Sequence, residues 1–181
     1  MKSFEQARER TKHANDGPRW IPVAAAALAV LAATAGYLSS IRSTSALFAK
    51  NESIVATTRA SDAYAQYQAE RLKFYVTQTA LDQGVTGTNV EKLRATAKRE
   101  TAKAPPLLAR AHTYDEEAVA WNERSDRLLR EHETIEFGST LFEVAIVLVS
   151  ATALVGSRLL PVTAAVAAAL GMLFLVAGLL V

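Results

Sequence analysis

The chain has 181 residues, of which 50% are hydrophobic and 21% charged, with a formal net charge of +2 and no cysteine. Without cysteine, disulfide scaffolds, thiol catalysis, iron–sulfur clusters and cysteine-based zinc sites are excluded. The charges are segregated, because residues 20–41 have none and residues 139–181 have only Glu143 and Arg158. This distribution is typical of a polar module between membrane spans, not of one soluble domain.

The first transmembrane helix is predicted over residues 20–41. Its 22 residues contain no ionisable group, and about 20 apolar residues cross a hydrocarbon core of roughly 30 Å. Trp20 and Tyr37 lie near its ends, where aromatic rings favour the headgroup region. A cleaved signal peptide is the competing interpretation. Because residues 1–19 contain several acidic side chains, we expect the segment to be retained.

A long helical hairpin is predicted over residues 42–137. No Gly or Pro occurs from Ser43 to Asp82, and this composition favours a helix. One face of that helix forms a stripe close to an eleven-residue repeat, which we expect to pack against the returning arm. Its members are Leu47, Asn51, Ile54, Thr58, Asp62, Ala65, Ala69, Leu72, Val76 and Ala80. A glycine-containing turn is predicted near residues 83–89.

The returning arm has a heptad pattern. Large residues recur every seven positions, and a small or polar residue follows each of the first four by four positions. The large set is Leu107, Tyr114, Trp121, Leu128 and Ile135, and the second set is Ala111, Ala118, Ser125 and His132. This seam predicts antiparallel coiled-coil packing within one chain. Pro105–Pro106 precedes it, so residues 90–104 are predicted to form a separate short helix or a kinked extension.

Two further transmembrane helices are predicted over residues 139–156 and 160–181. The link at 156–158 is so short that these helices must form an antiparallel pair. The predicted fold class is therefore an all-α membrane protein with three transmembrane helices and a long antiparallel coiled-coil hairpin between the first two.

The orientation follows from the basic residues in the short segments. Residues 1–19 carry five Lys or Arg, and Arg158 lies in the short link, so the positive-inside rule predicts that both are cytoplasmic. Residues 42–136 carry 14 basic and 14 acidic residues and are long enough to be translocated largely regardless of charge. Arg42 and Lys50, near the bilayer, favour the opposite orientation. We expect the hairpin to lie outside the cytoplasm.

Three polar residues, Asn51, Asp62 and His132, interrupt otherwise small or apolar stripes. They could form a polar binding site between the helices, or they could fix the register of the helix pair. Asn51 and His132 fall at similar heights, so a hydrogen bond between them is expected. Glu143 is a candidate functional group because ionisable residues inside a membrane are costly, although it lies only one turn inside its span.

A second stripe on the first arm contains four large residues, Tyr64, Tyr67, Arg71 and Phe74. It could be an interface with another chain, or it could pack against residues 90–104. No phosphate-binding loop, dinucleotide fingerprint, nucleophile elbow or metalloprotease helix is present. The three histidines include no Glu-x-x-His pair. We therefore expect no enzymatic activity, no metal and no cofactor, and the balanced charges argue against nucleic acid.

The segment 60–73 resembles a bacterial membrane family known as domain of unknown function 4337. Members carry Ala-Ser-Asp, an aromatic residue, Tyr-Gln-Ala and a basic residue just after a first span, as residues 60–71 do here. The later stretch 114–117 and the C-terminal helix pair also fit. Tyr64, Gln66 and Glu70 stand where the family usually has Trp, Tyr and Lys. The resemblance implies a multi-pass protein of the bacterial inner membrane, with no assigned activity.

Three functional hypotheses remain. The first is a non-enzymatic membrane protein whose hairpin mediates self-association, or docks as an accessory or scaffold subunit of a larger membrane complex. The second is a sensory or ligand-binding module that signals through the first span. The third is an ion pathway that uses Glu143. The expected partners are membrane lipids together with other copies of the chain or a larger membrane complex.

Overall fold

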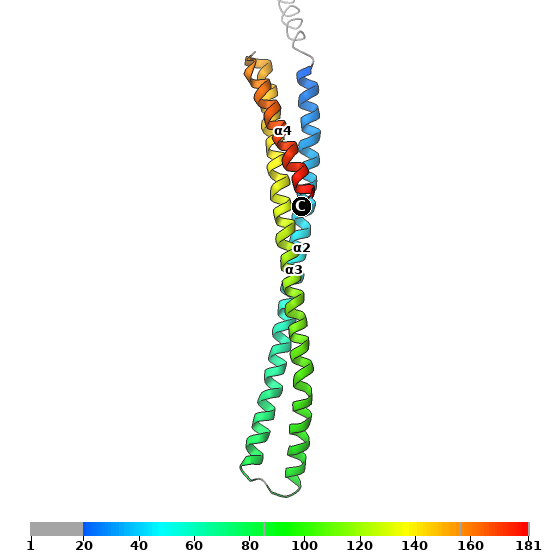
Figure 1. The fold of residues 1–181 in the computed structure, drawn as a ribbon, viewed down its shortest axis with the longest axis vertical. Helices are drawn as coiled ribbons and strands as arrows, with labels where there is room; N and C mark the ends of the chain where they lie inside the picture. Colours follow the sequence, from blue (N-terminus) through cyan, green and yellow to red (C-terminus); the bar gives the residue numbers. More distant parts are fainter. Residues whose placement is uncertain (1–19, 85, 156, 181) are drawn as a thin grey trace, which may run out of the picture. The chain divides into compact units, whose positions relative to one another are not determined.

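The computed structural model describes residues 20–84, 86–155 and 157–180, and these form three helices and no strand (Figure 1). The helices are α2 (Trp20–Asp82), α3 (Thr88–Val155) and α4 (Leu159–Leu180). The predicted all-helical class is confirmed. Each of the three helices contains a stretch that is long and apolar enough to cross a membrane. The segment 1–19, predicted to be cytoplasmic, lies outside the described residues.

The helices contribute to two packed units. One unit combines the chain up to Ser45 with the chain from Arg127 onward, and the other runs from Ala46 to Asp126. We call the first the apolar unit and the second the polar unit. Helices α2 and α3 each contribute to both units, whereas α4 belongs only to the apolar unit.

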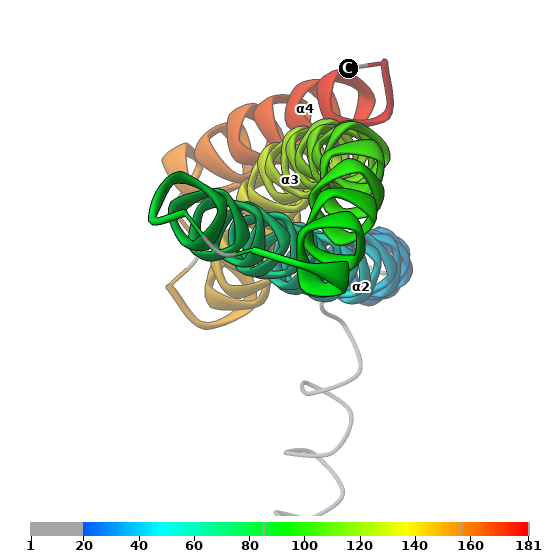
Figure 2. The same ribbon diagram turned by 90° about the horizontal axis from the view of Figure 1, so that it is seen from below.

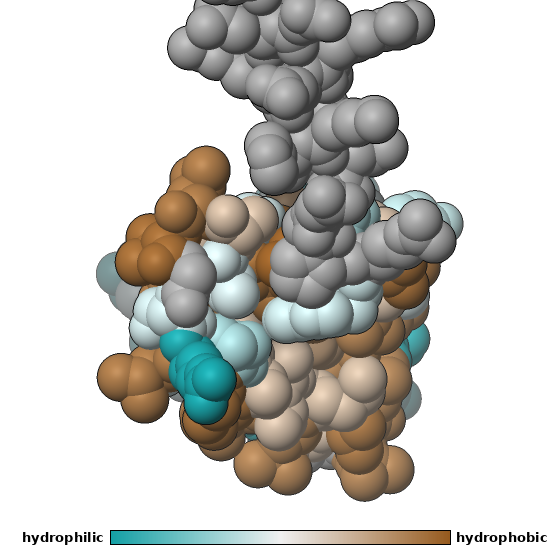
Figure 3. Space-filling model, turned by 90° about the horizontal axis from the view of Figure 1, so that it is seen from above, coloured by the Kyte–Doolittle hydropathy of each residue, from teal (hydrophilic) through white to brown (hydrophobic). Residues whose placement is uncertain are grey.

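The core of the apolar unit contains residues from all three helices. One buried cluster consists of Ala32, Ala35, Ile135, Phe142 and Leu175, and a second joins Ile21, Val149 and Ala164. Figure 3 looks onto the end of this unit where α3 and α4 connect, and its outer surface is largely hydrophobic.

Helices α3 and α4 approach each other closely at three glycines. A Cβ atom added at Gly138 would lie 2.9 Å from the carbonyl oxygen of Gly171, and one added at Gly171 would lie 3.0 Å from the carbonyl oxygen of Gly138. A Cβ at Gly178 would lie 2.6 Å from Ile135 Cγ1. Small residues allow this kind of contact between membrane helices. Figure 1 shows α4 alongside the yellow part of α3.

In the polar unit, α2 packs through a row of small residues spaced alternately by three and four positions. The buried members are Ala46, Ala49, Ser53, Ala56, Ala60 and Ala63. The row continues with Tyr67, Glu70 and Phe74, which are half-buried, and ends with Thr77, which is buried. This spacing keeps one face of a helix against its neighbour over many turns.

On α3 the corresponding face repeats every seven residues. Ala97, Ala104, Ala111, Ala118 and Ser125 are buried, and Leu107, Tyr114 and Trp121 are half-buried beside them. Ser53 Oγ donates to the Ala118 carbonyl at 3.0 Å, and Ser125 Oγ donates to the Ala46 carbonyl at 2.9 Å. Along these contacts, residue numbers rise in α2 and fall in α3. Figure 2 shows the green segments of both helices side by side.

The predicted packing stripe of α2 is corrected by this arrangement. Leu47, Ile54, Leu72 and Val76 are more than half exposed, and Asn51, Asp62, Ala65 and Ala69 are exposed as well. The alanine row lies on roughly the opposite side of the helix, because 3.6 residues complete one turn. The sequence-based prediction assigned the larger side chains of α2 to the contact with α3, whereas the structure places the small side chains there.

Of the two predictions for residues 90–104, the separate short helix is wrong, because both prolines lie inside the single helix α3 and these residues extend the returning arm. The turn lies between Asp82 and Thr88. Gly84 and Gly87 have φ values of 79° and 85° there, and glycine adopts this left-handed region without a steric cost. The Gly84 amide donates to the Leu81 carbonyl at 3.2 Å, so it satisfies a carbonyl in the last turn of α2.

Matched substitutions can identify the packed face of α2. Ala60→Leu adds volume at a position that is 2% exposed, and we expect a loss of about 1–3 kcal/mol in the free energy of unfolding. Ala109→Leu makes the same change at an exposed position of α3, outside the α2 stripe, and should be nearly neutral, because Ala and Leu have similar helix propensities. Chemical unfolding in detergent, followed by circular dichroism, measures both. An equal loss of stability in the two variants would contradict the assignment of Ala60 to the packed face of α2.

Glycine-to-alanine substitutions test the contact between α3 and α4. Gly138→Ala should destabilise the protein by about 1–3 kcal/mol, because the added methyl group meets backbone atoms of Gly171 and Leu175 that cannot rotate away. Gly36→Ala is the control, since its Cβ would lie 3.7 Å from Ser139 Oγ, an ordinary contact. Alanine's higher helix propensity should leave that variant unchanged or up to about 1 kcal/mol more stable. Unfolding by dodecyl sulfate in mixed micelles measures the difference.

Candidate functional site

A polar groove of about 520 Å³ lies in the apolar unit, between α2 and α3. The side contributed by α2 contains Gly36, Ser39, Ser40, Ser43 and Thr44. The side contributed by α3 contains His132, Glu136, Ser139, Thr140 and Glu143. Two residues singled out from the sequence, His132 and Glu143, therefore line one groove. We refer to it below as the hydroxyl groove.

His132 joins the two helices through its ring. Its Nδ1 atom lies 2.6 Å from Ser39 Oγ and 3.0 Å from the Ser39 carbonyl oxygen. Its Nε2 atom lies 3.3 Å from a carboxylate oxygen of Glu136, one turn further along α3. The expected hydrogen bond to Asn51 is not formed by this ring, which instead contacts Ser39 and Glu136.

Ser39, His132 and Glu136 have the residue types of a nucleophilic triad, but their setting favours a structural role. Ser39 is 4% exposed, and its hydroxyl is bonded to the ring of His132 on the neighbouring helix. The surrounding amides lie within continuous helices, where they donate to backbone carbonyls and cannot form an oxyanion hole. The three side chains therefore form a hydrogen-bonded link between α2 and α3.

A second polar link lies next to this one. Arg42 Nε lies 3.1 Å from a carboxylate oxygen of Glu131, which is 8% exposed. A buried carboxylate is costly unless it is paired, so Arg42 compensates the charge that α3 buries at this level. Neither Arg42 nor Glu131 lines the hydroxyl groove.

Glu143 lies at the far end of the hydroxyl groove, in the apolar part of α3. Its residue is exposed, and the described parts of the chain provide it with neither a hydrogen bond nor an ion pair. This differs from Glu131 and Glu136, which both have cationic or imidazole partners. Glu143 is therefore the carboxylate of this groove that the protein itself leaves uncompensated.

The polar unit contains a charged cluster where Glu70 of α2 meets Glu100 of α3. Lys73 Nζ lies 3.1 Å from one carboxylate oxygen of Glu70, and Lys103 Nζ lies 3.8 Å from the other. Lys103 also lies 3.4 Å from Glu100, and Arg99 lies 3.3 Å from it. Glu100 is only 3% exposed. The hydrogen bond from Lys73, with the positive charges of Lys103 and Arg99, lowers the pKa of Glu70.

Tyr64, the first residue of the predicted partner interface, contacts α3. Its hydroxyl donates to a carboxylate oxygen of Asp115 at 2.8 Å and lies 3.3 Å from His112 Nδ1. The Tyr64 and His112 rings meet edge to face, with centroids 5.9 Å apart. The bond to Asp115 raises the pKa of the Tyr64 phenol, because the carboxylate stabilises the protonated form.

The other three members of that predicted interface line a groove of about 310 Å³ with α3. Tyr67, Arg71 and Phe74 face residues 100–108 there. Arg71 stacks over Tyr75 with 5.1 Å between its guanidinium carbon and the ring centroid, and it also donates to the Tyr75 hydroxyl. The stripe was predicted either to contact another chain or to pack within its own chain, and these contacts favour packing within the chain.

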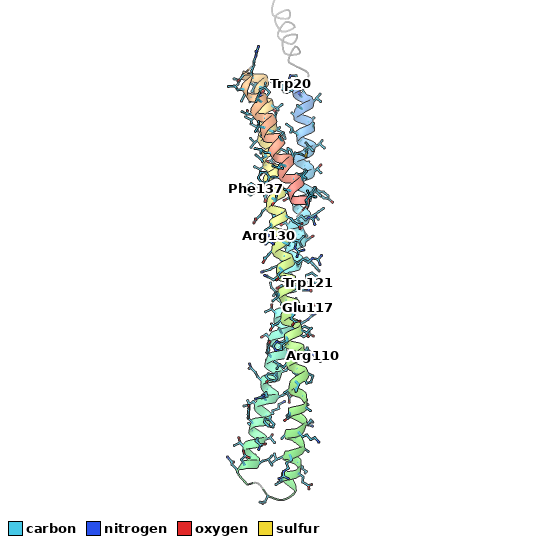
Figure 4. The ribbon with its side chains drawn as sticks, in the orientation of Figure 1. Trp20, Arg110, Glu117, Trp121, Arg130 and Phe137 are labelled. Carbon is cyan, nitrogen blue, oxygen red and sulfur yellow. The ribbon has the colours of Figure 1, made fainter. Side chains whose placement is uncertain are left out.

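The remaining predicted residues fall into two groups. In the heptad set, Ile135 is fully buried, and Trp121 packs edge to face on Phe48 with centroids 6.3 Å apart. Figure 4 labels Trp121 on α3. Asn51 and Asp62 are exposed on α2 and are not brought together with His132. In the described ranges, no group of three or more His, Asp and Glu residues is arranged to hold a metal ion.

Sequence reasoning missed the residues that pair with His132 and the charged cluster. Ser39 and Glu136 became visible only once the register between α2 and α3 was known. Glu70 and Glu100 occupy positions of the 3-4 spaced rows, and the alternation of alanines at three and four positions was the signal that could have located them.

Together these features define an all-helical protein with three helices able to cross a membrane, in which polar links join α2 to α3. The chain belongs to the family described as a domain of unknown function (DUF4337), whose sequence pattern matches residues 18–181. The resemblance noted for residues 60–73 is thereby confirmed. No curated protein and no solved structure matched the chain.

The charged cluster predicts a pH dependence of stability. Because the pKa of Glu70 is lowered in the folded protein, its contribution is present above the unfolded pKa of about 4.3 and is lost as the pH falls through the folded value. Thermal unfolding should show Glu70→Gln melting below the wild type at pH 6–8, with the gap closing below about pH 4. Glu116→Gln, at an exposed position, is the control. A gap that stays constant with pH would contradict the assignment.

Proposed function

We propose that this protein is a non-enzymatic, multi-pass membrane protein whose polar unit mediates association between copies of the chain. Membrane insertion is supported by the surface of the apolar unit, where most large exposed side chains are apolar. They include Val23, Val30, Val144, Val147, Leu154, Val162 and Leu173. A patch of this extent on all three helices is unfavourable in water and favourable in lipid.

The proposed orientation places residues 1–19 and the α3–α4 link in the cytoplasm. It is supported by the five basic residues before Trp20 and by Arg158 in the link. The polar unit is then on the opposite side of the membrane. For a member of this family we propose the inner membrane of a bacterium as the location.

We propose further that the polar unit is an antiparallel coiled-coil hairpin. The support is the heptad spacing of the buried alanines on both helices and the reciprocal bonds of Ser53 and Ser125. A seam of alanine lets the two backbones come close, so each serine reaches a carbonyl of the other helix. Such a hairpin is stiff, which suits a module that presents one surface to a partner.

The exposed stripe of α2 is the single observation that carries the proposal of self-association. Leu47, Ile54, Leu72 and Val76 are 65%, 56%, 65% and 62% exposed on the face away from the alanine row. Full burial of such a side chain contributes roughly 1.5–3 kcal/mol. A helix with apolar residues on two opposite faces has a second packing surface, which the described part of this chain leaves uncovered.

A second copy is the proposed occupant because it fits the geometry of a membrane. Two copies in one bilayer present the same stripe at the same height, so a two-fold axis normal to the membrane can pair it with itself. Asn51 lies within the stripe, and an asparagine at such a position fixes register and the number of strands. Docking onto a different subunit of a membrane complex is the other outcome of the test below.

Native mass spectrometry in mild detergent tests this proposal. The wild type should appear as a dimer or higher oligomer, and Ile54→Lys and Val76→Lys should shift it to the monomer, because each places a charge in the stripe. Ala120→Lys is the control, since Ala120 is exposed on α3 and the substitution likewise replaces an apolar residue with Lys.

A wild-type chain that is strictly monomeric would contradict self-association. A stable complex with a different membrane protein, sensitive to Val76→Lys and not to Ala120→Lys, would reassign the stripe to that subunit. Circular dichroism of each variant shows whether helix content is retained.

A further inference from the structure

We propose that the hydroxyl groove binds a primary ammonium group, such as that of an aminophospholipid headgroup or of a free amine, with Glu143 as its main carboxylate partner. The inference goes beyond self-association and rests only on the membrane placement proposed above. It follows from the charge, the hydrogen-bonding groups and the size of the groove.

The charge of the lining favours a cation. Among the residues that line the groove, Glu136 and Glu143 are acidic and none is Lys or Arg. The nearby guanidinium of Arg42 is engaged by Glu131 at 3.1 Å. A surface of one sign with low-dielectric walls concentrates ions of the opposite sign.

Glu143 is the residue that most requires a bound cation. It lies in the apolar part of α3, and within the described residues it has no charged or hydrogen-bonding partner. An ionised carboxylate at the edge of a hydrocarbon region is costly and is retained where it meets a counter-charge or a proton. The position one turn inside the predicted span places that counter-charge at the depth of lipid headgroups.

The hydroxyls determine which kind of cation fits. Thr44 and Thr140 donate their hydroxyl hydrogens to the Ser40 and Glu136 carbonyls at 2.9 and 3.0 Å, so their oxygens remain free to accept. Ser40 and Ser43 add two more hydroxyls to the same wall. A primary ammonium has three N–H donors, and it can bond a carboxylate and hydroxyl oxygens at the same time.

The spacing argues for an organic cation over a bare metal ion. Glu136 and Glu143 are seven residues apart on one helix, a rise of about 10 Å, whereas a calcium ion requires its oxygen ligands within about 2.6 Å. The volume of about 520 Å³ lies in the range of pockets that hold small organic molecules. A headgroup or a small amine therefore fits the volume of the groove and the separation of its two carboxylates along α3.

The experiment uses the full chain in lipid nanodiscs. Discs of phosphatidylglycerol with either phosphatidylethanolamine or phosphatidylcholine differ in the ammonium, because the choline headgroup has no N–H donor. Native mass spectrometry of protein released from the discs should show phosphatidylethanolamine retained about tenfold over phosphatidylcholine, the size of one charge-assisted hydrogen bond. Incorporation into discs reports membrane insertion separately, so failure of the membrane placement is distinguishable from failure of this site.

Free amine is tested in discs that lack phosphatidylethanolamine. If the source is a soluble amine, millimolar ethanolamine should raise the midpoint of thermal unfolding, and tetramethylammonium, which has no N–H donor, should not. A shift with ethanolamine but no lipid preference assigns the site to free amines, and the converse assigns it to the lipid. If the protein shows no lipid preference and no shift with ethanolamine, the proposal is wrong.

Glu143→Gln keeps the shape of the side chain and removes its charge, so it should abolish the retention or the shift. Glu136→Gln should reduce it, because that carboxylate is shared with His132. Glu133→Gln is the control, since Glu133 is exposed on α3 and does not line the groove. Retention unchanged in Glu143→Gln, with circular dichroism showing a folded protein, would overturn the assignment to Glu143.

Discussion

The close approach of helix backbones through small side chains is the constraint on which the rest of this structure depends. In the polar unit, alanines and serines form the contact between α2 and α3, and the serines reach carbonyls across it. In the apolar unit, Gly138 and Gly171 bring the backbones of α3 and α4 into contact. A short distance between axes gains dispersion energy over the whole backbone, and it also excludes larger residues from the contact.

The large apolar residues must therefore lie outside the helix contacts, and their position determines how hydrophobic the surface of each unit is. In the apolar unit they point outward, where lipid is the favourable surrounding. In the polar unit the same rule leaves Leu47, Ile54, Leu72 and Val76 in solvent unless another helix covers them. The proposed self-association is thus a consequence of how the chain packs internally.

The sequence predicted the helices and the family well, and it predicted one packed face out of two. On α3 the large residues at 107, 114, 121 and 128 alternate with buried Ala or Ser, so size and position indicate the same face. On α2 the large residues and the alanine row lie on opposite faces, and size alone indicates the wrong one. Pro105 and Pro106 did not end α3, although neither residue has the backbone N–H that donates within a helix.

The candidate site could be predicted only in part, because its residues come from helices far apart in the sequence. His132 and Glu143 were recognisable as polar groups in small or apolar surroundings, but their partners depend on the register of α2 against α3, which the alanine row sets. The register brings Ser39 to His132 and Arg42 to Glu131. His132 is thus bonded to Ser39 and Glu136, and Glu131 is paired with Arg42, whereas Glu143 has no such partner among the described residues. A ligand for the groove is therefore defined by Glu143, the carboxylate in its lining that has neither a hydrogen bond nor an ion pair within the described residues.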